Sequence, residues 1–181
     1  MAPVALDLPA MRRVVEREGG CVVWGGNVRL SPADDVLIRV ERPLDFDSDG
    51  QLVASVLSKK VAAGSNHVLI DMPVGPTAKV RSDAAAESLT GRLGGTAAAL
   101  GLRLAVQRSD GRQPIGRGIG PALEARDVLQ VLRGDAAAPQ DLRERAIALA
   151  GELLDLVPGN VVGRGRVLAR ETLLSGQALR K

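Results

Sequence analysis

Short apolar runs alternate with amphipathic helical patterns along this chain, and that alternation limits its possible folds more than any other feature. Four of the runs are predicted strands, at residues 21–24, 36–40, 67–72 and 102–107. Stretches with apolar residues at helical spacing separate most of them. Such a pattern predicts βαβ units, and therefore an α/β fold with a mostly parallel sheet and helices on both faces.

The predicted helices carry start and stop signals. Asp7 can cap a helix over residues 8–18, and a second helix covers about residues 49–63 after a group of possible capping residues. Three further helices are predicted at residues 82–101, 139–157 and 167–181. Another predicted helix begins at Pro121. These lengths are typical of helices that pack on a sheet.

Composition excludes several classes of protein. No apolar run approaches the roughly 18 residues that cross a bilayer, and the first residues lack the pattern of a signal peptide. One cysteine and one histidine cannot form an internal disulfide or a structural zinc site. The 24 basic side chains barely outnumber the 21 acidic ones, and one tryptophan and one phenylalanine offer no stacking platform for bases. We therefore expect a cytoplasmic protein without a metal, a membrane partner or a nucleic-acid partner.

Candidate chemistry gathers on the second helix and after the third predicted strand. Ser55 and Lys59 share a helix face, with their Cβ atoms about 5 to 6 Å apart. Lys60 falls among apolar positions, where an unpaired ammonium is costly to bury. Lys79 lies in a loop that leaves a strand, where its ammonium can meet a phosphate or a base carbonyl. The alternative is that all three lysines are ordinary surface residues whose charged ends reach water.

Other segments are better explained by structure than by chemistry. The sequence GRGIG at residues 116–120 stands between a strand and a helix, as a dinucleotide-binding loop would. It departs from GxGxxG because Pro121 occupies the last position, so tight packing of a turn explains it better. His67 opens a predicted strand and is expected to be structural. Cys21 begins another strand and is expected to be an inert thiol in the core.

Long stretches of the chain resemble the thymidine phosphorylase and AMP phosphorylase family. They are residues 21–80, which include SVLSKK and DMPVGPTAKV, residues 113–135, QPIGRGIGPALEARDVLQVLRGD, and the later LRERAIALAGELLDL. RVERPL and SVLSKK are most similar to the AMP phosphorylase and type-2 thymidine phosphorylase branch. The resemblance implies an incomplete nucleoside phosphorylase core domain. It also implies a pentosyltransferase of nucleotide salvage, in which inorganic phosphate splits thymidine or AMP into the free base and a pentose phosphate.

The resemblance implies roles for individual residues. Asp47, one of three carboxylates in DFDSD, matches the proton donor of the AMP phosphorylase branch. Ser55 and Lys79 match substrate-binding positions of that branch, and Ser55 and Lys59 match the serine and lysine that hold the base in the thymidine branch. Such groups suit the reaction, because the leaving base gains negative charge as its glycosidic bond breaks.

The family implies no cofactor, with inorganic phosphate as co-substrate, and a full-length protein that forms homo-oligomers. A base-site arginine also belongs to the family, and spacing does not decide whether Arg39 or Arg42 matches it. Members are much longer and bind phosphate through segments that precede the part seen here, so we expect this chain alone to be inactive. A non-catalytic nucleotide-binding or assembly domain is the alternative. A dinucleotide-binding oxidoreductase is disfavoured by the incomplete glycine motif.

Two further expectations concern organisation. Residues 1–157 are expected to form a partial α/β phosphorylase domain, and residues 158–181 a basic helical tail that leads toward a further C-terminal domain. Ser55, Lys59 and Lys79 are expected to face one cleft, because helix spacing and the strand exit place them toward the carboxyl edge of the sheet. Asp47 is expected at the rim of that cleft.

Overall fold

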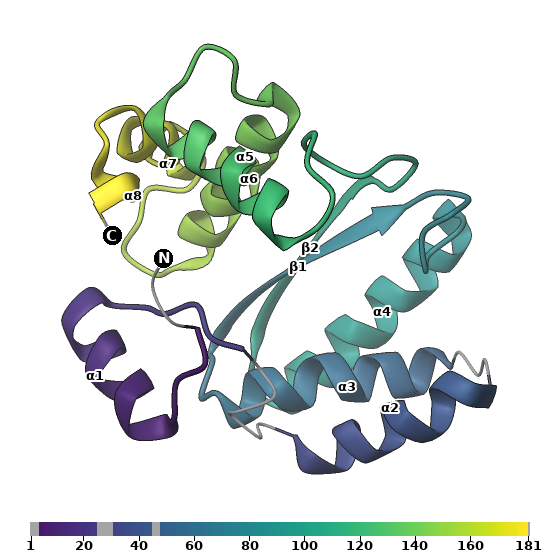
Figure 1. Ribbon diagram of the computed structural model, residues 1–181. Coiled ribbons are helices and arrows are strands. Elements are labelled where there is room, and N and C mark those ends of the chain that lie inside the picture. The colour runs from purple at the N-terminus through teal and green to yellow at the C-terminus, as the bar shows by residue number, and fades with distance from the viewer. Residues whose placement is uncertain (1–3, 25–30, 45–47, 181) are drawn as a thin grey trace. The chain divides into compact units, whose positions relative to one another are not determined.

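The computed structural model describes residues 4–24, 31–44 and 48–180 (Figure 1). The chain forms two compact units, Met1–Ser65 and Asn66–Lys181. Within the described residues the first unit is helical, and the second contains two strands as well as helices. No helix in the described part of the chain combines the length and apolarity that crossing a membrane requires. The expected boundary after residue 157 falls inside the second unit and stays a prediction.

The described part of the first unit holds three helices: α1 Leu8–Glu18, α2 Pro32–Leu44 and α3 Asp49–Ala62. Asp7 caps α1 because its carboxylate accepts a hydrogen bond from the Ala10 amide at 2.8 Å, and Gly19 ends α1 with a φ of 80°. Ser48 caps α3 by accepting a hydrogen bond from the Gln51 amide at 3.3 Å. The two helices predicted for this part of the chain are therefore confirmed.

Two strands predicted for the first unit are wrong. Residues 21–24 have no regular secondary structure, and Cys21 is exposed rather than part of a core. Residues 36–40 lie inside α2, whose first turn is closed by a 3.1 Å hydrogen bond from the Asp35 amide to the Ser31 carbonyl. A proline at the helix start and two aspartates in the first turn favour a helix there. These signals outweigh the strand preference of valine and isoleucine, which depends strongly on burial.

The second unit is built on a parallel pair of strands, β1 His67–Val74 and β2 Arg103–Asp110, which helix α4 Asp83–Ala99 connects. The strands are in register over their full lengths, starting with His67 opposite Arg103. They coincide with two predicted runs and extend beyond them at the carboxyl end. The β1–α4–β2 arrangement confirms the predicted α/β fold with a parallel sheet.

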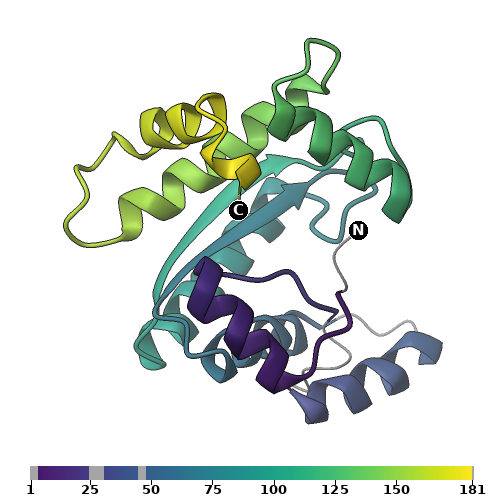
Figure 2. The same ribbon diagram turned by 60° about the vertical axis from the view of Figure 1, so that its left-hand side comes forward.

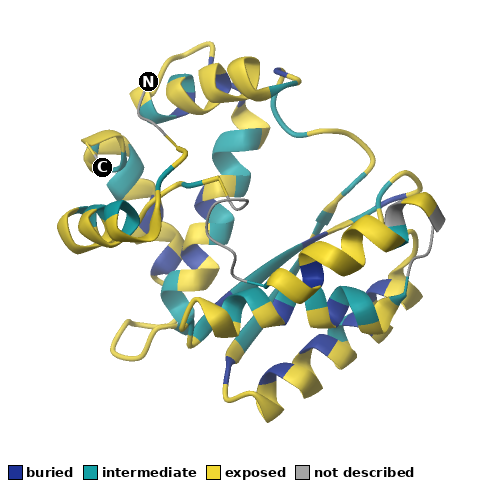
Figure 3. Ribbon diagram, turned by 60° about the horizontal axis from the view of Figure 1, so that its bottom comes forward, coloured by how far each residue is buried: buried dark blue, intermediate teal, exposed yellow. Residues whose placement is uncertain are grey.

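Helices cover this strand pair on both faces (Figures 1 and 3). One stripe of α4 is buried at helical spacing and consists of Ala86, Leu89, Leu93 and Ala97. Val68 and Met72 of β1 are also buried and point to one face of the pleat, since side chains alternate along a strand. Asp71 points to the other face, where Arg145 of α6 Gln140–Leu156 binds it. The predicted cover of helices on both faces is confirmed for these strands.

Three further helices complete the described second unit: α5 Pro121–Arg133, α7 Gly165–Leu174 and α8 Gln177–Arg180. α7 packs along α6 (Figure 2), and the contact requires glycine, because a Cβ atom on Gly165 would lie 2.1 Å from the Gly151 carbonyl oxygen. The tail predicted as one helix over residues 167–181 is two helices instead. Gly176 separates them with a φ of 73°, which an L side chain rarely adopts.

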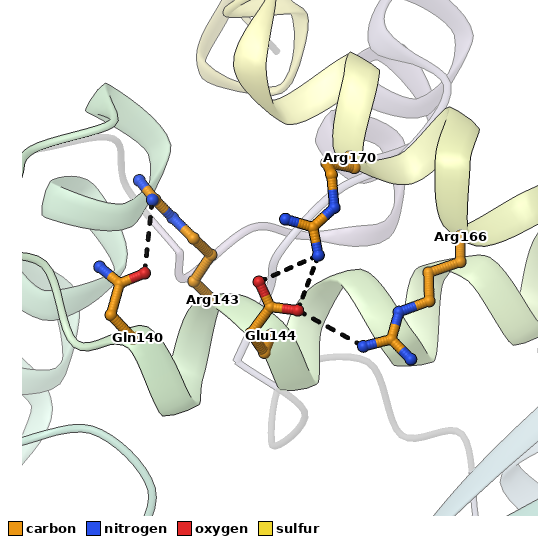
Figure 4. A network of polar contacts seen from close by, with 5 residues as sticks. All are labelled: Gln140, Arg143, Glu144, Arg166 and Arg170. Atoms are coloured by element: carbon orange, nitrogen blue, oxygen red, sulfur yellow. Dashed lines mark hydrogen bonds and ion pairs between the residues drawn. The ribbon is translucent and has the colours of Figure 1, made fainter.

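Arginines of α7 bind α6 through a shared carboxylate (Figure 4). Glu144 accepts hydrogen bonds from Arg170 at 2.8 and 3.1 Å and from Arg166 at 3.4 Å. The hydrogen bonds from Arg170 are the largest cause of a lowered pKa at Glu144. All three side chains are partly exposed, so these ion pairs contribute little to stability. They do neutralise part of the positive charge of the C-terminal segment.

Candidate functional site

Ser55 and Lys59 form a contact on α3. The helix is capped at Ser48, and its apolar face buries Val53 and Leu57, which leaves the serine and the lysine half-buried beside that face. The Lys59 ammonium donates a hydrogen bond to Ser55 Oγ at 3.2 Å. The predicted pairing of these two side chains across one helical turn is therefore present in the structure.

Asp34 of α2 binds both side chains. Its side chain is 4% exposed, and one oxygen, Oδ2, accepts a hydrogen bond from Ser55 Oγ at 2.9 Å and lies 2.5 Å from Lys59 Nζ. Sequence reasoning missed this residue, because reading residues 36–40 as a strand placed Asp34 in a connecting turn. The available signal was an acidic residue in the first turn after a serine and a proline, which marks a helix start.

The environment of Asp34 favours its ionised form. Burial by itself would raise the pKa of this carboxyl, but the hydrogen bonds from Lys59 and Ser55 and the charge of Lys59 leave it lowered overall. The second oxygen, Oδ1, is buried and accepts no hydrogen bond from any described residue. The site therefore holds an ionised, buried carboxylate, and only one of its two oxygens accepts hydrogen bonds from described residues.

The remaining hydrogen-bonding capacity of the pair follows from these contacts. The Ser55 hydroxyl donates its only proton to Asp34 and accepts from Lys59, so one acceptor position stays available on its oxygen. The Lys59 ammonium has three protons, and the two contacts described use two of them. The pair thus offers one acceptor and one donor side by side. This pattern complements a group that presents an N–H beside a carbonyl or a ring nitrogen.

Lys79 is exposed in the loop between β1 and α4. The loop closes through a 3.0 Å hydrogen bond from the Gly75 amide to the Val80 carbonyl. It also packs tightly against the exit of β2, because a Cβ atom on Gly75 would lie 2.7 Å from the carbonyl carbon of Gly111. The backbone that carries Lys79 is therefore held at the carboxyl end of the strand pair, as predicted from the strand exit.

The residues that are expected to line one cleft come from both units. Ser55 and Lys59 belong to the first unit and Lys79 to the second, and Asp47 lies outside the described residues. The shared cleft and the position of Asp47 at its rim therefore stay predictions. Arg39 is exposed on α2, and its choice over Arg42 as base-site arginine also stays open.

The loop at residues 116–120 is filled by the protein's own carboxylates. Asp127 Oδ2 accepts hydrogen bonds from the Arg117 and Gly118 amides at 2.7 Å each. The amides of Gly116 and Gly120 donate to two further carboxylates, those of Asp141 and Glu124. A Cβ atom on Gly118 would lie 2.4 Å from a carbonyl carbon of α5. Tight packing explains this glycine motif, and the amides that a dinucleotide would need are occupied.

Two further features lie in the second unit. Arg145 of α6 donates to both Asp71 and Ser109, and thereby fixes α6 to both strands. A surface cavity of about 260 Å³ lies at the α6–α7 connection, and its lining includes Leu154, Arg164 and Glu171. Its lining includes none of Ser55, Lys59 and Lys79, the predicted site residues that the structure describes. Among the described residues, no group of three or more histidine, cysteine or acidic side chains could hold a metal ion.

The whole chain is similar to longer bacterial proteins. It is 67% identical over 181 residues to "Putative thymidine phosphorylase 1" and 65% identical to "Putative thymidine phosphorylase 2", both from Acidovorax sp. (strain JS42). A "Putative thymidine phosphorylase" from Hahella chejuensis (strain KCTC 2396) is 62% identical over 181 residues. The matches cover 100% of this chain but only 35 to 36% of each relative. No protein-family model matches the sequence.

Proposed function

Because this chain belongs to the thymidine phosphorylase family, we propose that it forms part of a pentosyltransferase that splits a nucleoside or nucleoside monophosphate with inorganic phosphate. The identity of 67% along the entire chain carries the proposal. The chain spans about a third of the length of such relatives, so the proposed activity is that of a protein that contains this segment. No cofactor is required.

In the proposed reaction a phosphate oxygen attacks the anomeric carbon of the sugar while the bond from that carbon to the base breaks. The bonding electrons leave with the base nitrogen, and Asp47 supplies a proton to the departing base. Ser55 accepts an N–H of the base, and Lys59 donates to an adjacent acceptor that gains negative charge in the transition state. Lys79 contributes a positive charge toward a phosphate group or a base carbonyl. The products are the free base and a pentose 1-phosphate, which also carries the 5′-phosphate when the substrate is a nucleoside monophosphate.

The donor and acceptor of the Ser55–Lys59 pair suit both candidate bases. Thymine presents an N–H between two carbonyl groups, and adenine presents an amino group beside a ring nitrogen. Each offers an N–H to Ser55 and an acceptor to Lys59. Thymidine and AMP are therefore the two substrates to compare, and an enzyme assay rather than the geometry separates them.

The test is a chimaera in which this chain replaces the matched segment of the 67% identical Acidovorax protein. Release of thymine from thymidine, and of adenine from AMP, is followed with and without inorganic phosphate. We expect phosphate-dependent release of one base, with loss of most activity in Lys59→Ala. The substitution Lys181→Ala serves as the control for loss of an ammonium group.

Base binding without release would favour the alternative of a non-catalytic nucleotide-binding or assembly domain. Neither binding nor release by the chimaera, in the presence of an active parent protein, would contradict the proposed function. The parent protein is assayed in parallel for that reason.

A further inference from the structure

We propose that Asp34 is a positioning residue for substrate binding. Its buried carboxylate holds Ser55 and Lys59 in the arrangement in which they present one acceptor and one donor. The inference rests on the proposed function for the identity of the substrate. The arrangement itself depends only on the three side chains, all of which belong to the first unit.

The burial of Asp34 is the first argument. Among the described side chains of α2 it is the only buried one, whereas Val36 is 60% exposed and Val40 is 55% exposed. A helix that packed for stability alone would bury the valines and leave the aspartate in water. In its observed orientation, α2 instead brings Asp34 into contact with Ser55 and Lys59.

The energetics of the contact are the second argument. An apolar group at such a position is often as stabilising as a buried ion pair, so stability does not explain the carboxylate. Asp34 Oδ1 is moreover buried without a described hydrogen-bond partner, which carries a cost in stability. The Lys59 side chain is 34% exposed and could reach water without its partner. The ion pair between Asp34 and Lys59 therefore restrains the lysine side chain. It is not needed to neutralise a buried ammonium group.

The consequence for Ser55 is the third argument. A serine hydroxyl rotates freely and can either donate or accept, but the bond to Asp34 Oδ2 at 2.9 Å commits its proton. Without Asp34 the hydroxyl and the lysine would each sample several orientations, and substrate binding would have to order them. Asp34 thus acts through its two neighbours and need not touch the substrate.

The first measurement follows the lysine directly in the full chain. The chain has four lysines, Lys59, Lys60, Lys79 and Lys181, so isotope labelling of lysine nitrogen gives a spectrum with few signals. We expect the ammonium protons of Lys59 to exchange with water more slowly than those of a lysine in an unstructured peptide. Asp34→Asn, which keeps the shape of the side chain, should speed the exchange of Lys59 protons on the order of tenfold. Unchanged exchange at Lys59 would overturn the inference.

A matched control comes from the same helical turn. Asp35 is exposed and stands beside Asp34, so Asp35→Asn removes the same charge without touching Ser55 or Lys59. It should leave the exchange of Lys59 protons unchanged. Acceleration by both substitutions alike would assign the effect to the general charge of α2 and would also overturn the inference. If Asp34→Asn lowers the melting temperature of the chain, Asp34→Glu is measured instead, because it keeps the charge.

The second measurement is kinetic and uses the chimaera described above. Asp34→Asn should lower kcat/KM for the active substrate about tenfold or more, chiefly through KM, while Asp35→Asn changes it less than twofold. In a background that carries both Ser55→Ala and Lys59→Ala, Asp34→Asn should add less than a twofold loss, since the residue acts through those two side chains. An equal loss in both backgrounds would show a general structural role. If the chimaera neither binds nor releases a base, that result contradicts only the proposed function. The exchange of Lys59 protons with water then decides the role of Asp34.

Discussion

Asp47 is the residue whose replacement tests the proposed chemistry most directly. In the chimaera, Asp47→Asn should lower kcat on the order of a hundredfold or more and change KM less, because proton donation matters as the bond breaks. Steady-state kinetics with the active substrate measure both constants. Asp49→Asn is the control, since that carboxylate lies in the first turn of α3. Weaker binding with unchanged turnover would make Asp47 a positioning group instead.

Asp127 makes the loop at residues 116–120 sensitive to acid. Hydrogen bonds from the Arg117 and Gly118 amides lower the pKa of Asp127 below its ordinary value of 3.8. A group with a lowered pKa in the folded protein stabilises it fully above the ordinary value, and this contribution is lost as the pH falls toward the lowered pKa. Protection of the Gly118 amide against hydrogen exchange, corrected for intrinsic rates, should therefore be constant from neutral pH to about pH 4 and fall below it.

The variant Asp127→Asn provides the check on that acid sensitivity. An amide oxygen can accept the same hydrogen bonds but does not titrate in this range, so protection of the Gly118 amide should be lower at neutral pH and independent of pH. An identical fall in protection with acid in both proteins would place the titrating group elsewhere.

Sequence reasoning at the scale of residues succeeded where the partners are local. The spacing of Ser55 and Lys59 on a helix was enough to predict their contact, because four residues make one turn. Asp34 could not be found in this way, since it stands 21 residues earlier and meets Ser55 only through the packing of two helices. The exposure of Cys21 was missed for a similar reason: an apolar sequence neighbourhood does not decide whether a segment is packed.

At the scale of elements, the packing of α6 on α7 gives a prediction about stability. A Cβ atom on Gly151 would lie 2.7 Å from the Cα atom of Arg166, so Gly151→Ala should lower the free energy of unfolding by about 1 to 3 kcal/mol. Gly94→Ala is the matched control, because Gly94 lies inside α4 with no atom within 4 Å of the added carbon. It should raise the free energy of unfolding by about 0.5 to 1 kcal/mol.

Chemical denaturation of the full chain, followed by circular dichroism, measures both glycine substitutions. The opposite signs separate a steric effect from the general effect of replacing glycine in a helix. Destabilisation by both variants to the same extent would show that the contact between α6 and α7 leaves room for a methyl group at Gly151.

The elements of the second unit could be predicted because several signals agree there. The runs at residues 67–72 and 102–107 are apolar, flanked by turn residues and separated by a helix of the right length. The run at residues 36–40 carries conflicting signals, with valine and isoleucine favouring a strand and the preceding proline and aspartates favouring a helix start. Local sequence alone does not rank such signals, since strand preference depends on the packing of the finished sheet.

At the scale of the whole molecule, the full chain by itself should show no measurable phosphorolysis. The chain matches only 35% of the length of such a relative, and the resemblance implies that the phosphate-binding segments of the family lie outside the matched part. Holding phosphate against the anomeric carbon can be worth about 7 to 11 kcal/mol of the activation barrier. Without that contribution the rate should fall below detection.

The assay incubates the purified chain with phosphate and either thymidine or AMP, and follows release of the base. The chimaera run beside it shows that the assay detects turnover. Phosphate-dependent release by the chain alone would mean that it carries its own phosphate site, and the prediction would then be wrong.

The occupied loop at residues 116–120 bears on where such a phosphate could come from. Asp127 is an anion attached to the same chain as the amides it binds, so it competes with dissolved anions at a high effective concentration, commonly millimolar or above. Phosphate in solution would have to displace this tethered competitor before it could use the loop. The amides of Arg117 and Gly118 are therefore not available to dissolved anions while Asp127 binds them. Under the proposed function, phosphate would be bound by other segments of a protein that contains this chain.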